Sequence, residues 1–133
     1  MKKIIIEKAG GYDQLKFVED ADLKVTHPND VLIQVAFSGV NYADCLVRLG
    51  VYASAKEYVG WPITPGFEVS GTVLAVGSNV QKYKVGDQVI GFTRFNGYSS
   101  QVLVPEEQVL PLPKQFSLAQ GASYPSVYAT AQY

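Results

Sequence analysis

The chain has 133 residues, of which 47% are hydrophobic and 17% are charged, and its formal net charge is −1. This length and composition indicate one globular domain, and the small net charge gives no electrostatic basis for binding nucleic acid or an anionic membrane. No apolar run approaches the roughly 20 residues of a membrane helix, and the N-terminus is not that of a signal sequence. The single cysteine, Cys45, excludes an internal disulfide and favours a cytoplasmic location.

The first part of the chain is predicted to form β-strands. β-branched and largely apolar runs predict strands at residues 4–6, 15–19 and 31–38, with no helical period before Gly39. The sequence His-Pro-Asn-Asp at residues 27–30 predicts a turn before the third strand, because proline fixes φ and Asn and Asp bond to their own backbone.

A short helix is predicted directly after the third strand. Asn41 is a favourable N-cap, Asp44 stands three residues later as in a capping box, and Gly50 suits a left-handed C-terminal cap. Asp44 and Arg48 are also spaced i,i+4, so an ion pair with Arg48 is a further structural role for Asp44. Residues 51–61 are predicted to be an irregular, aromatic-rich loop.

The middle of the chain is predicted to be β-structure, in segments separated by Gly, Asn and Pro turns: 68–76, 88–92, 98–104 and 109–110. Gly71 and Gly91 fall inside these strands, which indicates bulges or bends of the kind that close a small barrel. Near the end, Ser117 and Gln120 predict a capping box that opens a short helix, and Pro125 is expected to interrupt it.

Several motifs occur in an order that is typical of one known family: GVNYAD from Gly39, PITPGFEVSGTV from Pro62, VGSNV from Val76 and VGDQVIG from Val85. Together they resemble the N-terminal, GroES-like domain of medium-chain dehydrogenase/reductase enzymes, and most closely the zinc-independent quinone oxidoreductase and enoyl reductase branch. The resemblance covers nearly the whole chain. It implies a mainly β fold, a GroES-like distorted β-barrel with a few short helices.

The resemblance also implies a Rossmann nucleotide-binding domain, and no G-x-G-x-x-G fingerprint occurs in this chain. We therefore expect residues 1–124 to form the substrate-side domain and residues 125–133 to begin the helix that leads to the missing domain. The implied reaction is hydride transfer from NADPH, bound mainly by that domain, to a quinone or an α,β-unsaturated carbonyl compound. Alone, the chain is expected to be inactive.

Zinc is not expected. The resemblance aligns Asn41 and Phe67 with a cysteine and a histidine that bind zinc in other members of the superfamily, and a phenyl ring cannot be a ligand. Cys45 and His27 are too few for a site, and one is predicted on a helix and the other in a proline turn. The structural-zinc loop of four cysteines is also missing.

Without a metal, hydrogen-bond donors must polarise the substrate. The candidate catalytic residues are Asn41, whose amide could bind a substrate oxygen or the nicotinamide, and Tyr52, a candidate proton donor. Their structural alternatives are helix capping and simple packing. For Glu68 we expect a buried ion pair or a solvated position. The resemblance suggests cofactor contacts by Asn41, Tyr42, Asp44 and Thr130. The candidates for an apolar substrate wall are Phe67, Phe92, Phe95 and Tyr98, with core packing as their structural alternative.

Two of these assignments are open. Tyr42 could stack on the cofactor or fill the core. Thr130 matches the threonine of a Thr-Ala-Tyr motif in the family, but Gln132 stands where that motif has its tyrosine.

The sequence leaves two other functions open. One is a free-standing GroES-like binding module or co-chaperonin-type oligomer, because fold does not fix function; a ring-shaped oligomer in size-exclusion chromatography would support it. The other is a zinc alcohol dehydrogenase relative that has lost its metal. The expected partners are a small-molecule substrate and the chain's own missing Rossmann domain, with a homodimer allowed for the full enzyme and no nucleic acid or membrane.

Overall fold

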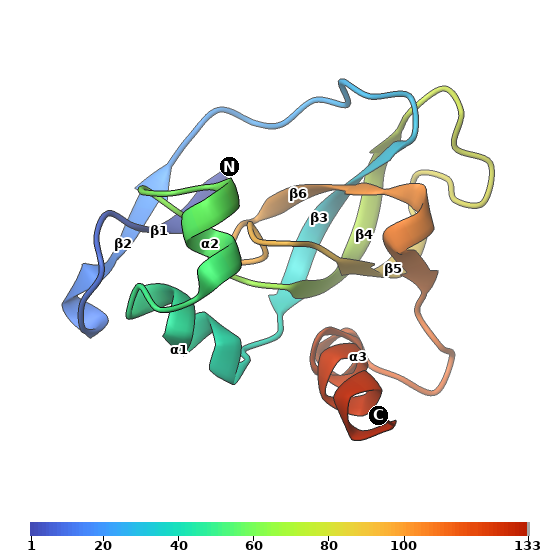
Figure 1. Ribbon diagram of the computed structural model, residues 1–133. Coiled ribbons are helices and arrows are strands. Elements are labelled where there is room, and N and C mark those ends of the chain that lie inside the picture. Colours follow the sequence, from blue (N-terminus) through green and yellow to red (C-terminus); the bar gives the residue numbers. More distant parts are fainter. Residues whose placement is uncertain (133) are drawn as a thin grey trace.

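A computed structural model describes the backbone of residues 1–132 and the side chains of residues 1–125 (Figure 1). The strands are β1 (Lys2–Ile6), β2 (Leu15–Glu19), β3 (Asp30–Ser38), β4 (Glu68–Val76), β5 (Gln88–Phe92), β6 (Gln101–Pro105) and β7 (Val109–Pro111). The helices are α1 (Tyr42–Arg48), α2 (Ala53–Tyr58) and α3 (Leu118–Gln132), with 3-10 turns η1 (Tyr12–Gln14) and η2 (Glu106–Gln108). The predicted mainly β fold with few short helices is confirmed.

The principal layer is a five-stranded antiparallel sheet in the order β6-β3-β4-β5-β7, and β1 and β2 form a separate two-stranded sheet. The larger sheet is curled into a half-barrel, and α1 and α3 both lie near the same end of β3 and β4 (Figure 1). Alternating residues of the strands fill one core, made of Val31, Ile33, Val69, Val73, Val89, Val102, Val104 and Val109. Burial alternates cleanly only along β6, whereas β3, β4 and β5 contain runs of three or four consecutive buried residues, as expected of strands covered on both faces.

The sheet is bulged beside Gly71, as predicted, whereas the pairings of Gly91 with β4 and β7 are regular, so the bulge predicted there is not found. The register between β3 and β4 shifts between Leu32 and Ile33 and again between Val35 and Phe37. Gly71 pairs with Val35 inside this region, and a Cβ on Gly71 would lie 1.9 Å from the carbonyl oxygen of Gln34. Only glycine allows the two backbones to approach this closely, so the bend requires a glycine at position 71.

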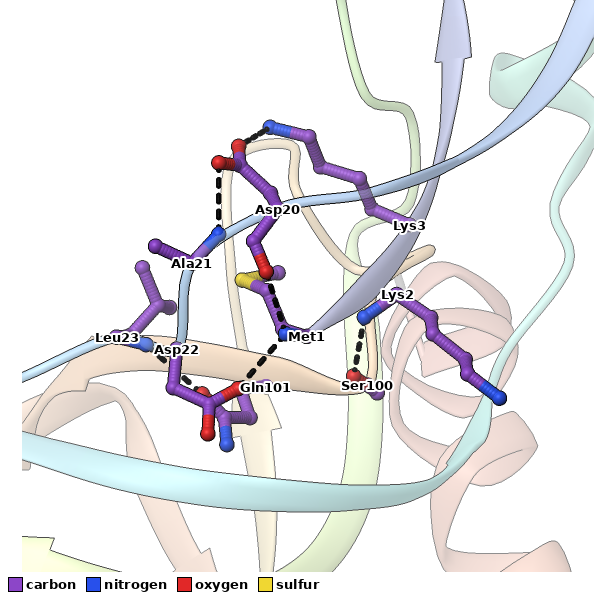
Figure 2. Close-up of polar contacts among 9 residues, drawn as sticks. All are labelled: Met1, Lys2, Lys3, Asp20, Ala21, Asp22, Leu23, Ser100 and Gln101. Atoms are coloured by element: carbon purple, nitrogen blue, oxygen red, sulfur yellow. Dashed lines mark hydrogen bonds and ion pairs between the residues drawn. The ribbon is translucent and has the colours of Figure 1, made fainter.

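The small β1–β2 sheet is tied to the larger one through the N-terminus (Figure 2). The Met1 amino group donates to the Asp20 carbonyl and to Asp22 Oδ1, each at 2.7 Å. The N–H of Lys2 donates to Ser100 Oγ at 2.8 Å. Residues 98–100 were predicted to belong to the strand that begins at Gln101. They bond to β1 through the Tyr98 carbonyl and the Ser100 N–H, and only the Ser100 carbonyl also bonds to β3.

Two helix predictions were wrong. Residues 53–58 form helix α2 where an irregular loop was expected: the N–H of Ala55 bonds to the carbonyl of Tyr52, and the helix ends at left-handed Gly60 (φ 74°), whose N–H bonds to the Ala55 carbonyl. The short run of Ala, Ser, Lys and Glu between aromatic residues sufficed to nucleate it.

The predicted interruption at Pro125 does not occur, because α3 runs through it. A proline inside a helix removes one backbone hydrogen bond, here the bond to the carbonyl of Gly121. The start of α3 is held by the predicted capping box, in which the N–H of Ser117 donates to Gln120 Oε1 at 2.8 Å. It is also held by Ser70 Oγ, which donates to the carbonyl of Leu118.

Candidate active site

The site begins where the end of β3 passes into α1. Asn41 is the N-cap of α1 and forms the predicted capping box with Asp44, whose Oδ2 accepts the Asn41 N–H at 2.9 Å. The Asn41 side chain also reaches the first residue of β4, because its Nδ2 donates to Glu68 Oε1 at 3.0 Å. Asn41 therefore serves as a helix cap and is at the same time bonded to a buried carboxylate.

Glu68 is buried, with 1% of its surface exposed, so the solvated alternative for this residue is wrong. Its backbone carbonyl accepts the N–H of Gly39 at 3.0 Å. A Cβ on Gly39 would lie 2.4 Å from Glu68 Oε1 and 2.3 Å from the carbonyl oxygen of Ala122 in α3. The strand β4, the β3–α1 turn and the helix α3 thus meet around the Glu68 carboxylate.

Asp44 is the second buried carboxylate, with 5% of its surface exposed. Its Oδ2 accepts a second bond, from the Tyr98 hydroxyl at 2.8 Å, and its Oδ1 has no hydrogen bond of normal geometry among the described residues. Burial raises the pKa of Asp44 above its usual value, and the negative charge of Glu68 raises it further, while N–H and O–H groups of Asn41, Tyr98 and Gly66 oppose the shift.

The Tyr98 phenol is locked in its protonated form. Burial raises the pKa of Tyr98, and the bond to Asp44 raises it further. The sequence suggested only an apolar or core role for Tyr98. Its hydroxyl contact was missed because 54 residues separate the partners and no local pattern links them.

The expected ion pair between Asp44 and Arg48 is wrong. Arg48 Nη1 donates to the carbonyl of Gly10 at 2.7 Å, and its guanidinium lies 4.5 Å from the ring centroid of Tyr12. Asp44 is turned inward by the capping box and by Tyr98, so the spacing on the helix does not bring the two charges together.

An aromatic group stands beside this polar network. The ring centroids of Tyr52 and Phe67 are 5.7 Å apart, those of Phe67 and Phe95 5.3 Å, and those of Tyr52 and Phe95 6.3 Å with perpendicular planes. Phe95 is 3% exposed and belongs to a second core with Ile6, Val47, Ala55 and Ile63, so it supports the other two rings from beneath. Tyr52 and Phe67 are half-buried and form the accessible part of the wall.

The remaining candidates lie around this centre. Phe92 is half-buried and pairs with Glu68 across the sheet, outside the aromatic group. Tyr42 is 78% exposed, which excludes the core role and leaves its ring accessible. The side chain of Thr130 lies outside the described residues.

Tyr52 and Asn41 contact two consecutive residues of the chain, Phe67 and Glu68. Phe67 packs against the Tyr52 ring, and the next residue, Glu68, holds the Asn41 amide. A pocket between α1 and α2 that Tyr52 borders has only about 10 Å³ of free volume, roughly that of one water molecule. A substrate that meets Tyr52 must therefore approach from the open side of the aromatic wall.

The residues present do not fit a zinc ion. Among residues 1–125 no three His, Cys, Asp or Glu side chains lie close enough together to hold a metal. Phe67 offers no donor atom, and Nδ1 of His27 accepts the N–H of Asn29 in a surface turn. Within the part of the chain that is described, no helix is both long enough and apolar enough to span a bilayer.

Comparison with known proteins identifies the family. Residues 27–114 match the model of the alcohol dehydrogenase GroES-like domain. The chain is 35% identical over 132 residues to a quinone oxidoreductase from Sus scrofa, covering 98% of this chain and 39% of that protein. The chain therefore belongs to the alcohol dehydrogenase GroES-like domain family of the medium-chain dehydrogenases/reductases.

Solved structures agree with this assignment. The CurK enoyl reductase superposes with a TM-score of 0.90 at 34% identity, over 99% of this chain and 41% of that one. An Escherichia coli quinone oxidoreductase complexed with NADPH superposes with a TM-score of 0.83 at 28% identity, over 92% and 36%. The chain thus spans about two fifths or less of the length of these relatives.

Proposed function

We propose that this chain is the substrate-side domain of a zinc-independent oxidoreductase that transfers hydride from NADPH to a quinone or an α,β-unsaturated carbonyl compound. The observation that carries the proposal is Asn41 beside an aromatic wall: its side-chain amide donates to the buried Glu68 carboxylate, and its backbone N–H donates to the buried Asp44 carboxylate. Among residues 1–125 no set of side chains could hold a metal there. The relatives named quinone oxidoreductase and enoyl reductase, one of them complexed with NADPH, support it.

The chemistry of this domain is binding, orientation and proton donation. NADPH, held mainly by a further domain, supplies the hydride. Asn41 binds the carbonyl oxygen of the substrate or the carboxamide of the nicotinamide, and the accessible ring of Tyr42 fits a stacking contact with the cofactor. Asp44 is buried and already bonded to Asn41 and Tyr98, so its part is to hold the helix start on which Asn41 stands.

Tyr52 is the proposed proton donor. Its ring packs against Phe67 and Phe95 while the residue stays half-buried, so the orientation of the phenol is constrained and part of it is accessible. A phenol donates a proton at neutral pH when negative charge develops on its acceptor. The rings of Tyr52 and Phe67, tilted by 56° to each other, offer apolar faces to the planar ring or double bond of a quinone or enone and exclude water from it.

The test is a chimera in which this chain replaces the segment that it matches in the Escherichia coli quinone oxidoreductase. We expect the isolated chain to be inactive and the chimera to oxidise NADPH only when a quinone or an enone such as 1,4-benzoquinone or cyclohex-2-enone is present. A folded chimera that binds NADPH but reduces neither compound would refute the proposal, as would turnover by residues 1–133 alone.

A further inference from the structure

The Asn41 amide is bonded at its nitrogen end, and its oxygen is turned toward the first turn of α1. Its Nδ2 donates to Glu68 Oε1 at 3.0 Å, and its oxygen faces the N–H of Asp44 in the capping box. An asparagine amide has one oxygen and two N–H donors. With the oxygen turned toward the helix and one N–H turned toward Glu68, one N–H remains on a half-buried side chain.

Glu68 decides which way round the amide lies. A carboxylate accepts hydrogen bonds and donates none, so only the nitrogen end of Asn41 can face it. The carboxylate itself has little freedom, because Glu68 is buried at the start of β4, paired with Phe92, and pressed against the backbone of Gly39. The opposite orientation of the amide would place its oxygen against Glu68 Oε1, which is repulsive.

We propose that Glu68 is the positioning residue of the site: it orients Asn41 so that one amide N–H is presented to a neutral acceptor oxygen. The identity of that oxygen, a substrate carbonyl or a carboxamide, rests on the proposed function, whereas the orientation of the amide does not. The carboxylates of Glu68 and Asp44 both bond to Asn41, so their negative charges disfavour a carboxylate ligand there relative to an uncharged carbonyl.

The orientation is testable in the chain itself. In ¹⁵N-labelled protein, we expect one of the two Asn41 Nδ2 protons to exchange with solvent at least about tenfold more slowly than the other, since a bond to a charged acceptor is stronger than one to water. Equal exchange of the two protons in the unsubstituted chain would overturn the proposal without any variant being needed.

Glu68→Gln identifies the cause of this protection. The substituted amide can face Asn41 with either end, so the protection should fall to within about twofold of the unprotected proton. Ser70→Ala is the matched control: Ser70 is buried two residues further on β4 and bonds to Leu118, away from Asn41. It should leave the Asn41 protons unchanged. Full protection retained in folded Glu68→Gln protein would also overturn the proposal.

These outcomes are separable from those of the proposed function. A chimera that reduces quinones while its Asn41 protons exchange equally would overturn the role of Glu68 and leave the oxidoreductase assignment standing. Protected Asn41 protons that Glu68→Gln releases, in a chimera that reduces neither quinone nor enone, would do the reverse.

Discussion

The Tyr98 hydroxyl and the backbone N–H of Asn41 bind the same oxygen, Oδ2 of Asp44, at 2.8 and 2.9 Å. One buried carboxylate thus joins the start of α1 to the segment before β6. Among the described residues the other oxygen of Asp44 has no hydrogen bond of normal geometry, so these two donors are important to a carboxylate that has lost its water on folding.

Tyr98→Phe should therefore lower the free energy of unfolding by about 1–3 kcal/mol at neutral pH, the usual effect of depriving a buried charged acceptor of its donor. The loss should depend on pH. The pKa of Asp44 is raised by burial in the folded state, so its ionisation destabilises the fold as pH rises through the folded pKa, and this penalty is absent below the unfolded pKa of about 3.9. Removing the Tyr98 donor raises the folded pKa further.

The loss in Tyr98→Phe should accordingly be larger at about pH 8 than at about pH 4, measured by urea unfolding. Tyr83→Phe is the matched control, because the Tyr83 hydroxyl donates at 2.6 Å to an uncharged acceptor, the carbonyl of Val109. It should cost about 1 kcal/mol at both pH values. Equal losses at both pH values in Tyr98→Phe would show that Asp44 is not the titrating group.

Tyr52→Phe should separate catalysis from packing in the active chimera. The phenyl ring keeps its contacts with Phe67 and Phe95, so the melting temperature should change by only a few degrees. Loss of the proton donor should reduce kcat on an enone by about 10²-fold or more. Tyr58→Phe, at an exposed position on α2, is the control and should retain full activity. An unchanged kcat in Tyr52→Phe would exclude the proton-donor role.

Asn41→Asp should be more damaging than Asn41→Ala. Alanine removes the donor to the substrate, which should reduce kcat/KM by about 10²-fold. Aspartate removes the donor and also places a second negative charge against Glu68, so it should lower the melting temperature of the isolated chain as well. Calorimetry and steady-state kinetics measure the two effects. A fully active Asn41→Asp chimera would contradict the donor role.

Gly71→Ala should be strongly destabilising, by about 3 kcal/mol or more, because the new methyl group would meet a backbone carbonyl that cannot move aside. Gly91→Ala is a matched strand position where the added carbon would meet only side-chain tips, at 3.0 to 3.3 Å. Its effect should be clearly smaller in urea unfolding. Similar losses in the two variants would mean that the bulge opposite Gly71 does not constrain the sheet.

Zinc content tests the metal-free reading directly. Elemental analysis of the chimera, prepared without chelator, should find well under one zinc per chain, and treatment with EDTA should leave its activity unchanged. Phe67 and Asn41 lack the thiolate and imidazole that hold zinc in catalytic sites. Stoichiometric zinc together with EDTA-sensitive activity would favour the alcohol dehydrogenase alternative.

The sequence predicted those parts of the fold that local chemistry controls. The strands follow from β-branched and largely apolar runs, the α1 start from Asn41 and Asp44, and its end from Gly50, whose φ is 76°. Helix α2 was not predicted because it has only six residues and lies in a segment whose aromatic residues suggested an irregular loop. The break at Pro125 was predicted from local preference, and the contacts of α3 with the sheet override it.

The candidate site was predictable only in part. Asn41 and Tyr52 were found through motif and resemblance, and Asn41 does lie beside the aromatic wall through the sequence neighbours Phe67 and Glu68. The bond between Tyr98 and Asp44 and the burial of Glu68 depend on how distant strands pack, which no local pattern encodes. The i,i+4 spacing of Asp44 and Arg48 predicted an ion pair that does not form, because the capping box turns the Asp44 carboxylate inward.

Glu68 and Ser70 stand two residues apart on β4, one bonded to the Asn41 amide and the other to the carbonyl of Leu118 in the first turn of α3. Strand β4 therefore bonds both to the side-chain amide of Asn41 and to the first turn of α3. The carbonyl of Ala122, one turn further along α3, lies against Gly39 next to Glu68, so the first turns of α3, the start of β4 and the Asn41 donor share one packed unit.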